Sequence, residues 1–328
     1  MTLEFALPAA LEAHEPPEAR GLGRDGVRLL VSEGATGRVG HHRFTDLPSL
    51  LRGGDVLVVN TSATVPAAVP VLDSRLAVHF SSLQPDGTWL VELREAAAPF
   101  REGRAGTRYS LFGGGSVTLL RAFSAGRLWE SSVDTLGRGV SEYLAAFGAP
   151  IRYSYVGRRW PISYYSTVFG VTPGSAEMPS ASRPFTSRLV TRLVALGVQF
   201  APVLLHAGVA SPEVHERPCP ERFSVPLTSR RLVEAARAEG RRVIAVGTTA
   251  VRAIESSGDS GWTDLIVTAE RGVRCVDGLL TGFHEPRASH LDMLGAFVRA
   301  DLLCSTYESA LAGGYLWHEF GDLNLLLP

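Results

Sequence analysis

The second half of the chain alternates short apolar runs with amphipathic segments, and this alternation indicates a layered α/β structure. Apolar runs at residues 198–205, 242–246 and 264–267 are typical of buried strands. The spacing of the apolar side chains predicts helices at residues 186–196, 229–238, 251–256 and 289–303. Strands that alternate with helices form an α/β layer. The first 65 residues fit this layer, since they add predicted strands at 28–32 and 55–60 and a short helix at 47–52.

Residues 66–150 have a different pattern. Short strands are predicted between turns rich in Gly, Pro and Asp, at residues 76–81, 88–95, 107–111, 117–122 and 128–133. Short, regularly spaced strands of this kind predict a small β-barrel or sandwich. The expected fold class is therefore α/β (multidomain α+β), with an α/β layered part and a small all-β part.

The composition excludes several kinds of chemistry. All 32 basic residues are Arg, so the chain cannot form a lysine Schiff base, hold pyridoxal phosphate through a lysine, or carry a Walker A phosphate loop. The formal net charge of −1 means that a nucleic-acid partner would need a local basic patch. Cys219, Cys275 and Cys304 are far apart and HExxH is absent, so we expect no metal site and no disulfide framework. With no membrane-length apolar run and no signal-peptide pattern, we expect a cytoplasmic protein that does not enter a membrane.

Two glycine-containing turns differ in what they predict. Residues 21–26 match GxGxxG by letter, but no strand precedes them and no amphipathic helix follows, so we reject a dinucleotide site. Residues 242–252 (RVIAVGTTAVR) read as a buried strand, a glycine turn and a helix start. The free amides of such a start, with Gly247, Thr248 and Thr249, form a cradle for a carboxylate, a phosphate or a ribose hydroxyl, or only cap the helix. Arg252, one turn further on, favours a binding site.

Two histidines are candidates for acid–base chemistry. His206 follows the apolar run 203–205, and His284 follows another apparent strand end. Ligands collect at the carboxyl ends of strands in open α/β sheets, although histidines in such places also serve structural roles. Residues 151–160 combine aromatic side chains with Arg152, Arg158 and Arg159 and contain no acid. This segment suits RNA stacking and phosphate contacts, or equally an interdomain linker.

Taken together, these segments resemble the S-adenosylmethionine:tRNA ribosyltransferase-isomerase family of queuosine biosynthesis. The resemblance follows the order of nearly the whole chain, and its best piece is VIAVGTTAVRAIESS at residues 243–257. Supporting pieces are FTDL at 44–47, GDVLVVN at 54–60, VPA at 65–67, YSTVF at 165–169, LHAG at 205–208, VDGLLT at 276–281, FHEP at 283–286 and FGD at 320–322.

The resemblance implies a fold, a reaction and a set of site residues. The fold would be an α/β domain of residues 1–65 plus 153–328 with a β-barrel domain inserted at 66–152. The reaction would transfer and isomerise the ribosyl group of S-adenosylmethionine onto a 7-deazaguanine-type acceptor, the tRNA wobble base in the family, with release of adenine and methionine. A sulfonium acidifies the neighbouring C5′ protons, so a positioned base can remove one. The residues in matched segments would be catalytic His206, His284 and Glu221, and donor-binding Gly247, Thr248, Thr249, Arg252, Asp277 and Phe283.

The chain departs from the family pattern at several places. Ala63 and Ala68 stand where arginines are usual, and the family's PTAGLHF reads PSASRPF at residues 179–185, which puts Pro184 in place of a histidine. Other departures are Val209-Ala210-Ser211, Cys219 near the retained Glu221, and Glu285 in FHEP. These changes leave open whether the acceptor is tRNA or a small nucleobase-like molecule, whether the enzyme acts on S-adenosylmethionine as a lyase or isomerase, and whether it binds S-adenosylmethionine or RNA without catalysis. They also leave open whether the protein is a monomer or a small homo-oligomer.

Overall fold

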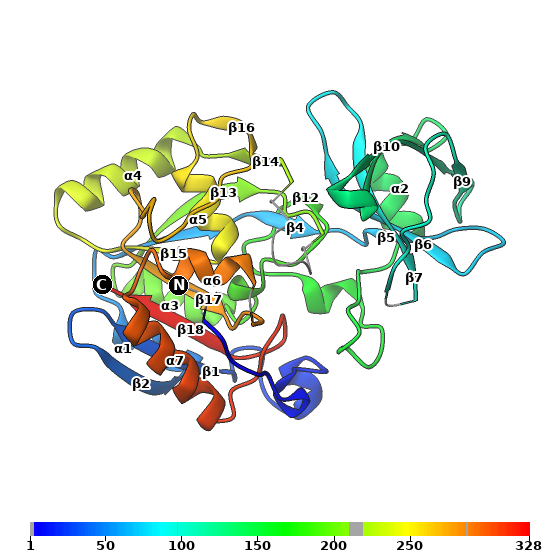
Figure 1. Cartoon of the computed structure of the whole chain (residues 1–328). Helices are drawn as coiled ribbons and strands as arrows, with labels where there is room; N and C mark the ends of the chain where they lie inside the picture. Colours follow the sequence, from blue (N-terminus) through cyan, green and yellow to red (C-terminus); the bar gives the residue numbers. More distant parts are fainter. Residues whose placement is uncertain (1–2, 97, 210–218, 287) are drawn as a thin grey trace.

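A nine-stranded mixed sheet forms the centre of the larger body of the molecule. The computed structural model describes residues 3–96, 98–209, 219–286 and 288–328. The strand order is β16-β14-β13-β3-β15-β17-β18-β1-β2 (Figure 1). The strands, in chain order, are β1 (Arg28–Glu33), β2 (Arg38–Arg43), β3 (Val56–Asn60), β13 (Gln199–Leu205), β14 (Glu221–Ser224), β15 (Val243–Val246), β16 (Ser260–Thr263), β17 (Gly278–Gly282) and β18 (Leu323–Leu327).

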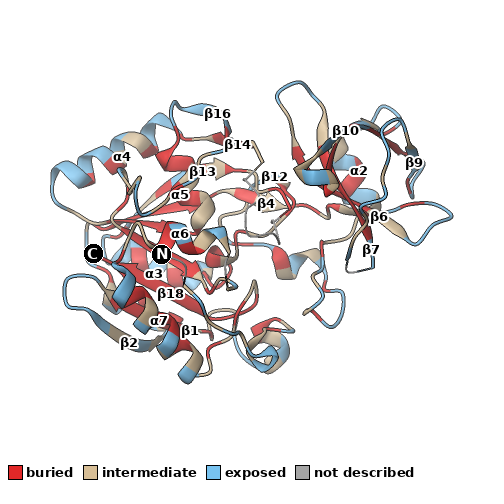
Figure 2. Ribbon diagram, in the orientation of Figure 1, coloured by how far each residue is buried: buried red, intermediate tan, exposed pale blue. Residues whose placement is uncertain are grey.

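Both faces of the centre of this sheet are buried, which explains why β3 and β15 are apolar along nearly their whole length. Val56 and Val58 of β3 face one core, whereas Leu57 and Val59 face the other, because side chains alternate along a strand. The first core is completed by α4 (Leu227–Ala238), α5 (Thr248–Glu255), α6 (Ser289–Leu294) and α7 (Ala300–Ala312). The second core is completed by α1 (Leu47–Leu50), α3 (Ser187–Ala195) and the 3-10 helix η6 (Ser180–Ser182). Figure 2 shows the buried strands between helices whose outer faces are exposed. The result is the three-layer α/β arrangement predicted from the sequence.

The four central strands are parallel, and this directs their carboxyl ends to one edge of the sheet. β13 pairs in parallel with β3, β3 with β15, and β15 with β17. β18 runs antiparallel to β17 and parallel to β1, so the amino ends of β18 and β1 lie at the same edge. Parallel α/β sheets bind their ligands at this edge.

A smaller body contains a seven-stranded antiparallel sheet and the helix α2 (Val140–Phe147) (Figure 1). Its edges meet through a bridge between Val71 and Leu111, so the sheet closes into a small barrel around a third core. Its strands are β5 (Ala68–Pro70), β6 (Leu76–Leu83), β7 (Trp89–Glu95), β8 (Ala98–Pro99), β9 (Arg108–Ser110), β10 (Ser116–Phe123) and β11 (Leu128–Asp134). A two-stranded sheet of β4 (Ser62–Thr64) and β12 (Thr172–Ser175) lies between the two bodies. The exact domain limits at 66 and 152 stay a prediction.

Two predicted elements are wrong. Residues 264–267 do not form a strand, and the strand in this region is β16, which ends at Thr263. The carbonyl groups of Thr263 and Leu265 instead accept hydrogen bonds from the Arg252 guanidinium. The predicted helix 289–303 is two helices, α6 and α7, because α6 ends at Gly295.

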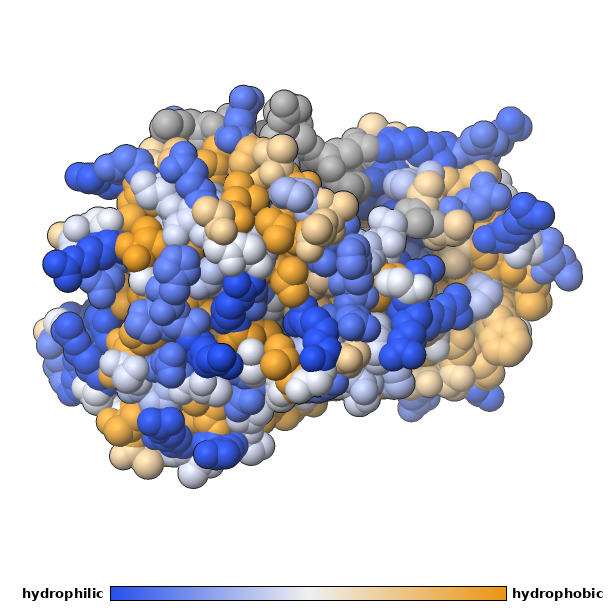
Figure 3. Space-filling view, turned by 90° about the horizontal axis from the view of Figure 1, so that it is seen from below, coloured by the Kyte–Doolittle hydropathy of each residue, from blue (hydrophilic) through white to orange (hydrophobic). Residues whose placement is uncertain are grey.

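The surface is mixed in character. In the face shown in Figure 3, hydrophilic and apolar residues are interspersed. Among the described residues, no helix combines the length and the apolar character that a membrane span requires.

Candidate active site

Polar residues gather where the central parallel strands end. Asn60 is the last residue of β3, His206 follows β13, and Gly247 and Thr248 follow β15. His284 follows β17. The strand order places His206 three strand positions from His284, which corresponds to about 14 Å at the usual strand spacing. The sheet edge therefore offers a row of polar groups long enough for an extended ligand.

Asn60 fixes the geometry of this edge. Its Nδ2 donates hydrogen bonds to the Leu205 carbonyl at 2.9 Å and to Thr249 Oγ1 at 3.1 Å. Its Oδ1 accepts from the backbone amides of Leu205 and Ser62, each at 3.0 Å. One buried amide thus ties together the ends of β3 and β13 and the start of α5. The sequence analysis did not single out Asn60, although a polar residue that ends an apolar strand was a usable signal.

His206 is held in one orientation by a pair of serines. Its Nδ1 lies 2.7 Å from Ser62 Oγ, which lies 2.6 Å from Ser175 Oγ. The ring also rests against Gly174, where an added Cβ would lie 2.5 Å from Nδ1. Burial lowers the pKa of His206 to about 4, with a further contribution from Arg222. At pH 7 the imidazole is neutral, and its Nε2 has no hydrogen bond within the described part of the chain. A neutral, oriented imidazole can accept a proton.

The turn after β15 has the predicted order of strand, glycine and helix start, and its role as a ligand cradle stays a prediction. Gly247 has φ +89°, a conformation that favours glycine, and it precedes α5. Its carbonyl accepts from the amides of Ala250 and Val251. The amides of Thr248 and Thr249, at the very start of the helix, have no such partner among the described residues, and amides in this position bind anions or hydroxyl groups. The Thr249 hydroxyl accepts a hydrogen bond from the Asn60 side chain, so its position at the start of α5 is fixed.

Glu221 and Arg252 form an ion pair. Glu221 of β14 pairs with the Arg252 guanidinium and also accepts the amide of Gly208 at 2.7 Å. Arg252 additionally donates to the carbonyls of Leu265 and Thr263, at 3.0 and 3.2 Å. Glu221 therefore fixes the backbone that follows His206, and Arg252 fixes the backbone at Thr263 and Leu265. Neither is free in this structure to receive a ligand.

His284 has a neighbour that the sequence analysis missed. Its ring stacks on His290 of α6, with centroids 4.7 Å apart and an interplanar angle of 7°. Its Nε2 lies 2.9 Å from Thr281 Oγ1. Burial lowers the pKa of both histidines, and that of His290 falls to about 4. Two parallel neutral imidazoles offer a flat surface suited to a purine.

Two predicted donor-binding residues lie elsewhere. Asp277 precedes β17 and accepts the amide of Val243 at 2.8 Å, so it lies at the amino ends of β15 and β17, the opposite edge of the sheet. It closes a turn there, and the structure does not bring it to the other site residues. Phe283 packs in the core against Tyr307 and Trp317. Phe283 directly precedes His284, and its buried ring fixes the position of that segment.

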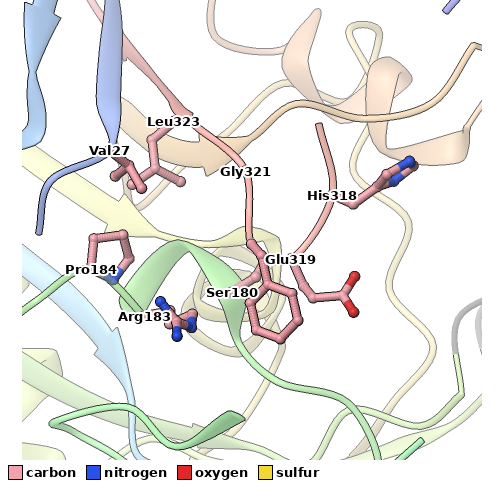
Figure 4. Close-up of a pocket in the computed structure, with 9 residues that line it drawn as sticks. Val27, Ser180, Arg183, Pro184, His318, Glu319, Gly321 and Leu323 are labelled. Atoms are coloured by element: carbon pink, nitrogen blue, oxygen red, sulfur yellow. The ribbon is translucent and has the colours of Figure 1, made fainter. Parts of the chain in front are cut away.

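A narrow pocket lies at the edge of the sheet where the parallel strands β13, β3, β15 and β17 end, beside the amino ends of β18 and β1 (Figure 4). Its volume is about 10 Å³, and it is lined by Val27, Ser180, Arg183, Pro184, His318, Glu319, Phe320, Gly321 and Leu323. Pro184 supplies no proton-transfer group here, as the sequence predicted. His318 and Glu319, which the sequence analysis did not single out, line the pocket with it. Residues 210 and 211, part of another departure from the family pattern, lie outside the described residues.

The fold and the site define a class: an α/β protein with an inserted barrel and a polar site at the carboxyl ends of its parallel strands. The model of the family described as "Queuosine biosynthesis protein" matches residues 1–326. This chain belongs to that family.

Curated relatives match the chain over nearly its whole length. An S-adenosylmethionine:tRNA ribosyltransferase-isomerase of Thermus thermophilus is 33% identical over 346 residues, which cover 99% of this chain and 98% of the relative. The protein of the same name from Heliobacterium modesticaldum is 31% identical over 367 residues, with the same coverage. The crystal structure of the S-adenosylmethionine tRNA ribosyltransferase from Thermotoga maritima matches with a TM-score of 0.56 and 27% identity, and covers 99% of both chains.

Proposed function

We propose that this protein is an S-adenosylmethionine:tRNA ribosyltransferase-isomerase. It transfers and isomerises the ribosyl group of S-adenosylmethionine onto a 7-deazaguanine base at the tRNA wobble position, and adenine and methionine leave. The observation that carries this proposal is the end-to-end similarity to relatives of that name, at 31–33% identity. The substrates are S-adenosylmethionine and tRNA.

The donor is assigned to the row of groups between His206 and His284. The amides of Thr248 and Thr249 bind the ribose hydroxyls of the donor, because hydroxyl oxygens can accept hydrogen bonds from the free amides of a helix start. The stacked rings of His284 and His290 hold the adenine. This placement directs the sulfonium and the C5′ carbon toward the β13 end of the site.

His206 is the base that we assign to the C5′ proton. The sulfonium acidifies this proton, and the neutral imidazole, oriented by Ser62, accepts it. A pKa of about 4 makes His206 a weak base in the empty site. The carboxylate of the bound donor would raise this pKa when it lies nearby, since a negative charge favours the imidazolium. Glu221 acts as a positioning residue, because it holds the Gly208 amide after His206, and Arg252 acts through its ion pair with Glu221.

The other functions are less well supported. A small-molecule acceptor, or binding without catalysis, was left open by the substitutions at Ala63, Ala68 and Pro184. The end-to-end similarity favours the tRNA reaction over these alternatives. Pro184 does not remove every titratable group from its pocket, because Glu319 and His318 lie there.

Mass spectrometry tests the proposed function. The protein is incubated with S-adenosylmethionine and an anticodon stem-loop that carries 7-aminomethyl-7-deazaguanine, and adenine, methionine and the RNA mass are followed. The expected result is release of adenine and methionine only with this RNA, together with a heavier stem-loop. Release without RNA would show a different acceptor or a lyase, and donor binding without release would show a binding protein.

A further inference from the structure

The narrow pocket of Figure 4 is lined by Glu319, a carboxyl group that forms no ion pair with the described residues. Glu319 accepts a hydrogen bond from the Tyr155 hydroxyl, and no Arg or His forms an ion pair with it among the described residues. Figure 4 shows Glu319 and His318 extending on one side of the pocket, with Arg183 and Pro184 on the other. Burial raises the pKa of Glu319, and the hydrogen bond from Tyr155 and the charge of Arg183 offset only part of this effect.

The cation nearest to this pocket is already neutralised. Arg183 is 2% exposed, and its guanidinium lies 2.9 and 3.1 Å from the two carboxylate oxygens of Glu18. His318 adds no charge at neutral pH, because burial lowers its pKa. Among the residues that line the pocket, Glu319 is therefore the carboxyl group that has no ion pair, whereas Arg183 is paired with Glu18. A volume of about 10 Å³, the space of one water, suits a group no larger than a primary ammonium.

Aromatic side chains hold this carboxylate in place and leave a hydroxyl group available. The Tyr155 ring stacks on His318 with centroids 3.8 Å apart, and the Tyr153 ring stacks on Tyr155 with centroids 5.7 Å apart. The buried hydroxyl of Tyr165 has no hydrogen-bond partner in the described structure. Burial and the nearby Glu319 raise the pKa of Tyr165 to about 12, so this hydroxyl remains protonated at neutral pH.

The pocket adjoins the donor cradle. Ala181, in the 3-10 helix that includes the pocket residue Ser180, lies 3.5 Å from where a Cβ on Gly247 would be. An acceptor group in the pocket would thus lie beside a donor bound at the start of α5.

We propose that this pocket binds the primary ammonium of an aminomethyl-bearing acceptor base, with Glu319 as its counter-ion and proton acceptor. The inference rests on the proposed function, which supplies the amine. An ammonium has no lone pair, so one N–H proton must move to the Glu319 carboxylate before the nitrogen can form a bond to the ribosyl carbon. The products of this step are a neutral amine and a neutral carboxylic acid.

The test compares Glu319→Gln with the wild-type protein. Binding is measured for two stem-loops, one with the aminomethyl base and one with the uncharged nitrile in its place. We expect the wild-type protein to prefer the amine at least tenfold, and Glu319→Gln to lose this preference while its affinity for S-adenosylmethionine stays unchanged. The rate of the variant should rise about tenfold per pH unit between pH 7 and 9, because the free amine then forms in solution, with a pKa of about 10.

A matched control and a second variant complete the test. Glu285→Gln removes an exposed carboxylate on the other side of His318, 3.6 Å from its Nδ1, and should leave the preference and the pH profile unchanged. Tyr155→Phe keeps the carboxylate but removes its donor, so the acid limb of the rate profile should move to higher pH. An active Glu319→Gln variant with wild-type preference and pH profile would overturn the inference and leave the proposed function intact. A wild-type protein that does not modify the aminomethyl stem-loop would overturn both.

Discussion

Replacement of Gly174 by Ala should displace His206. A Cβ at this position would lie 2.5 Å from Nδ1 and 2.7 Å from Nε2 of the imidazole. The φ of Gly174 is +159°, a value that residues with a side chain rarely adopt, so the substitution also strains the backbone. The His206→Ala background separates the clash with the imidazole from this strain.

The size of the effect follows from these distances. To reach an ordinary contact of 3.4 Å, the ring or the loop must move by about 1 Å. This movement breaks the 2.7 Å hydrogen bond to Ser62, and the overpacking costs about 1–3 kcal/mol of the free energy of unfolding. A 1 Å error in the position of a reacting group costs about 10²-fold in rate. We expect kcat to fall by about two orders of magnitude, with the affinity for S-adenosylmethionine nearly unchanged.

The assay is adenine release under saturating donor and stem-loop, with urea unfolding as the stability measurement. Gly157→Ala is the matched control, because a Cβ there meets nothing within 4 Å and its φ is not in the left-handed region. In the His206→Ala background, Gly174→Ala should have little further effect on rate, since the clash no longer exists. Full activity of Gly174→Ala, or an equal loss in both backgrounds, would refute the role assigned to His206.

Three further predictions concern the same edge of the sheet. Asn60→Ala should lower the free energy of unfolding by about 1–3 kcal/mol, because buried amides lose their acceptor, and calorimetry should show a lower melting temperature; an unchanged melting temperature would contradict this. Glu221→Ala should cost about 3–5 kcal/mol in urea unfolding, since it leaves the Arg252 charge without its carboxylate, and the double variant with Arg252→Met should recover part of that loss. Acid should destabilise the protein through His206 and His290, whose pKa of about 4 in the folded state lies below the ordinary value of 6.5. The stability that the two neutral histidines contribute is fully present above pH 6.5 and is lost as the pH falls toward 4. The urea midpoint should therefore be lower at pH 5 than at pH 7, and the difference should shrink in His206→Gln.

Local patterns predicted most of the elements that bury apolar side chains. The run GDVLVVN predicts a strand, and β3 is one of the inner strands of the sheet, buried on both faces. The turn at Gly247 was also predictable from the sequence, because a buried strand followed by a glycine and two hydroxyl residues is typical of a turn that begins a helix. Weaker local signals failed: β2, with its Arg and His residues, depends on pairing with β1 rather than on its own apolar pattern. α6 and α7 share one periodic pattern, which could not show the break at Gly295.

The site was predictable only in part, because a sequence pattern identifies strand ends but not their order in the sheet. His206, Thr249 and His284 follow strands, and the topology brings them to one edge. Asp277 also adjoins a strand, yet it lies at the start of β17, so the direction of that strand separates it from the others.

The amino-acid sequence by itself determined the fold class, the family and the turn after β15, since these depend on local patterns and on residue order along the chain. The tertiary structure alone decided the partners of each polar group. It pairs Glu221 with Arg252, stacks His284 on His290, and, within the described part of the chain, leaves Glu319 without an ion pair. These contacts join residues from separate elements, some of them far apart in the sequence. Whether a buried charge is neutralised depends on the packing of those elements, which no local pattern records.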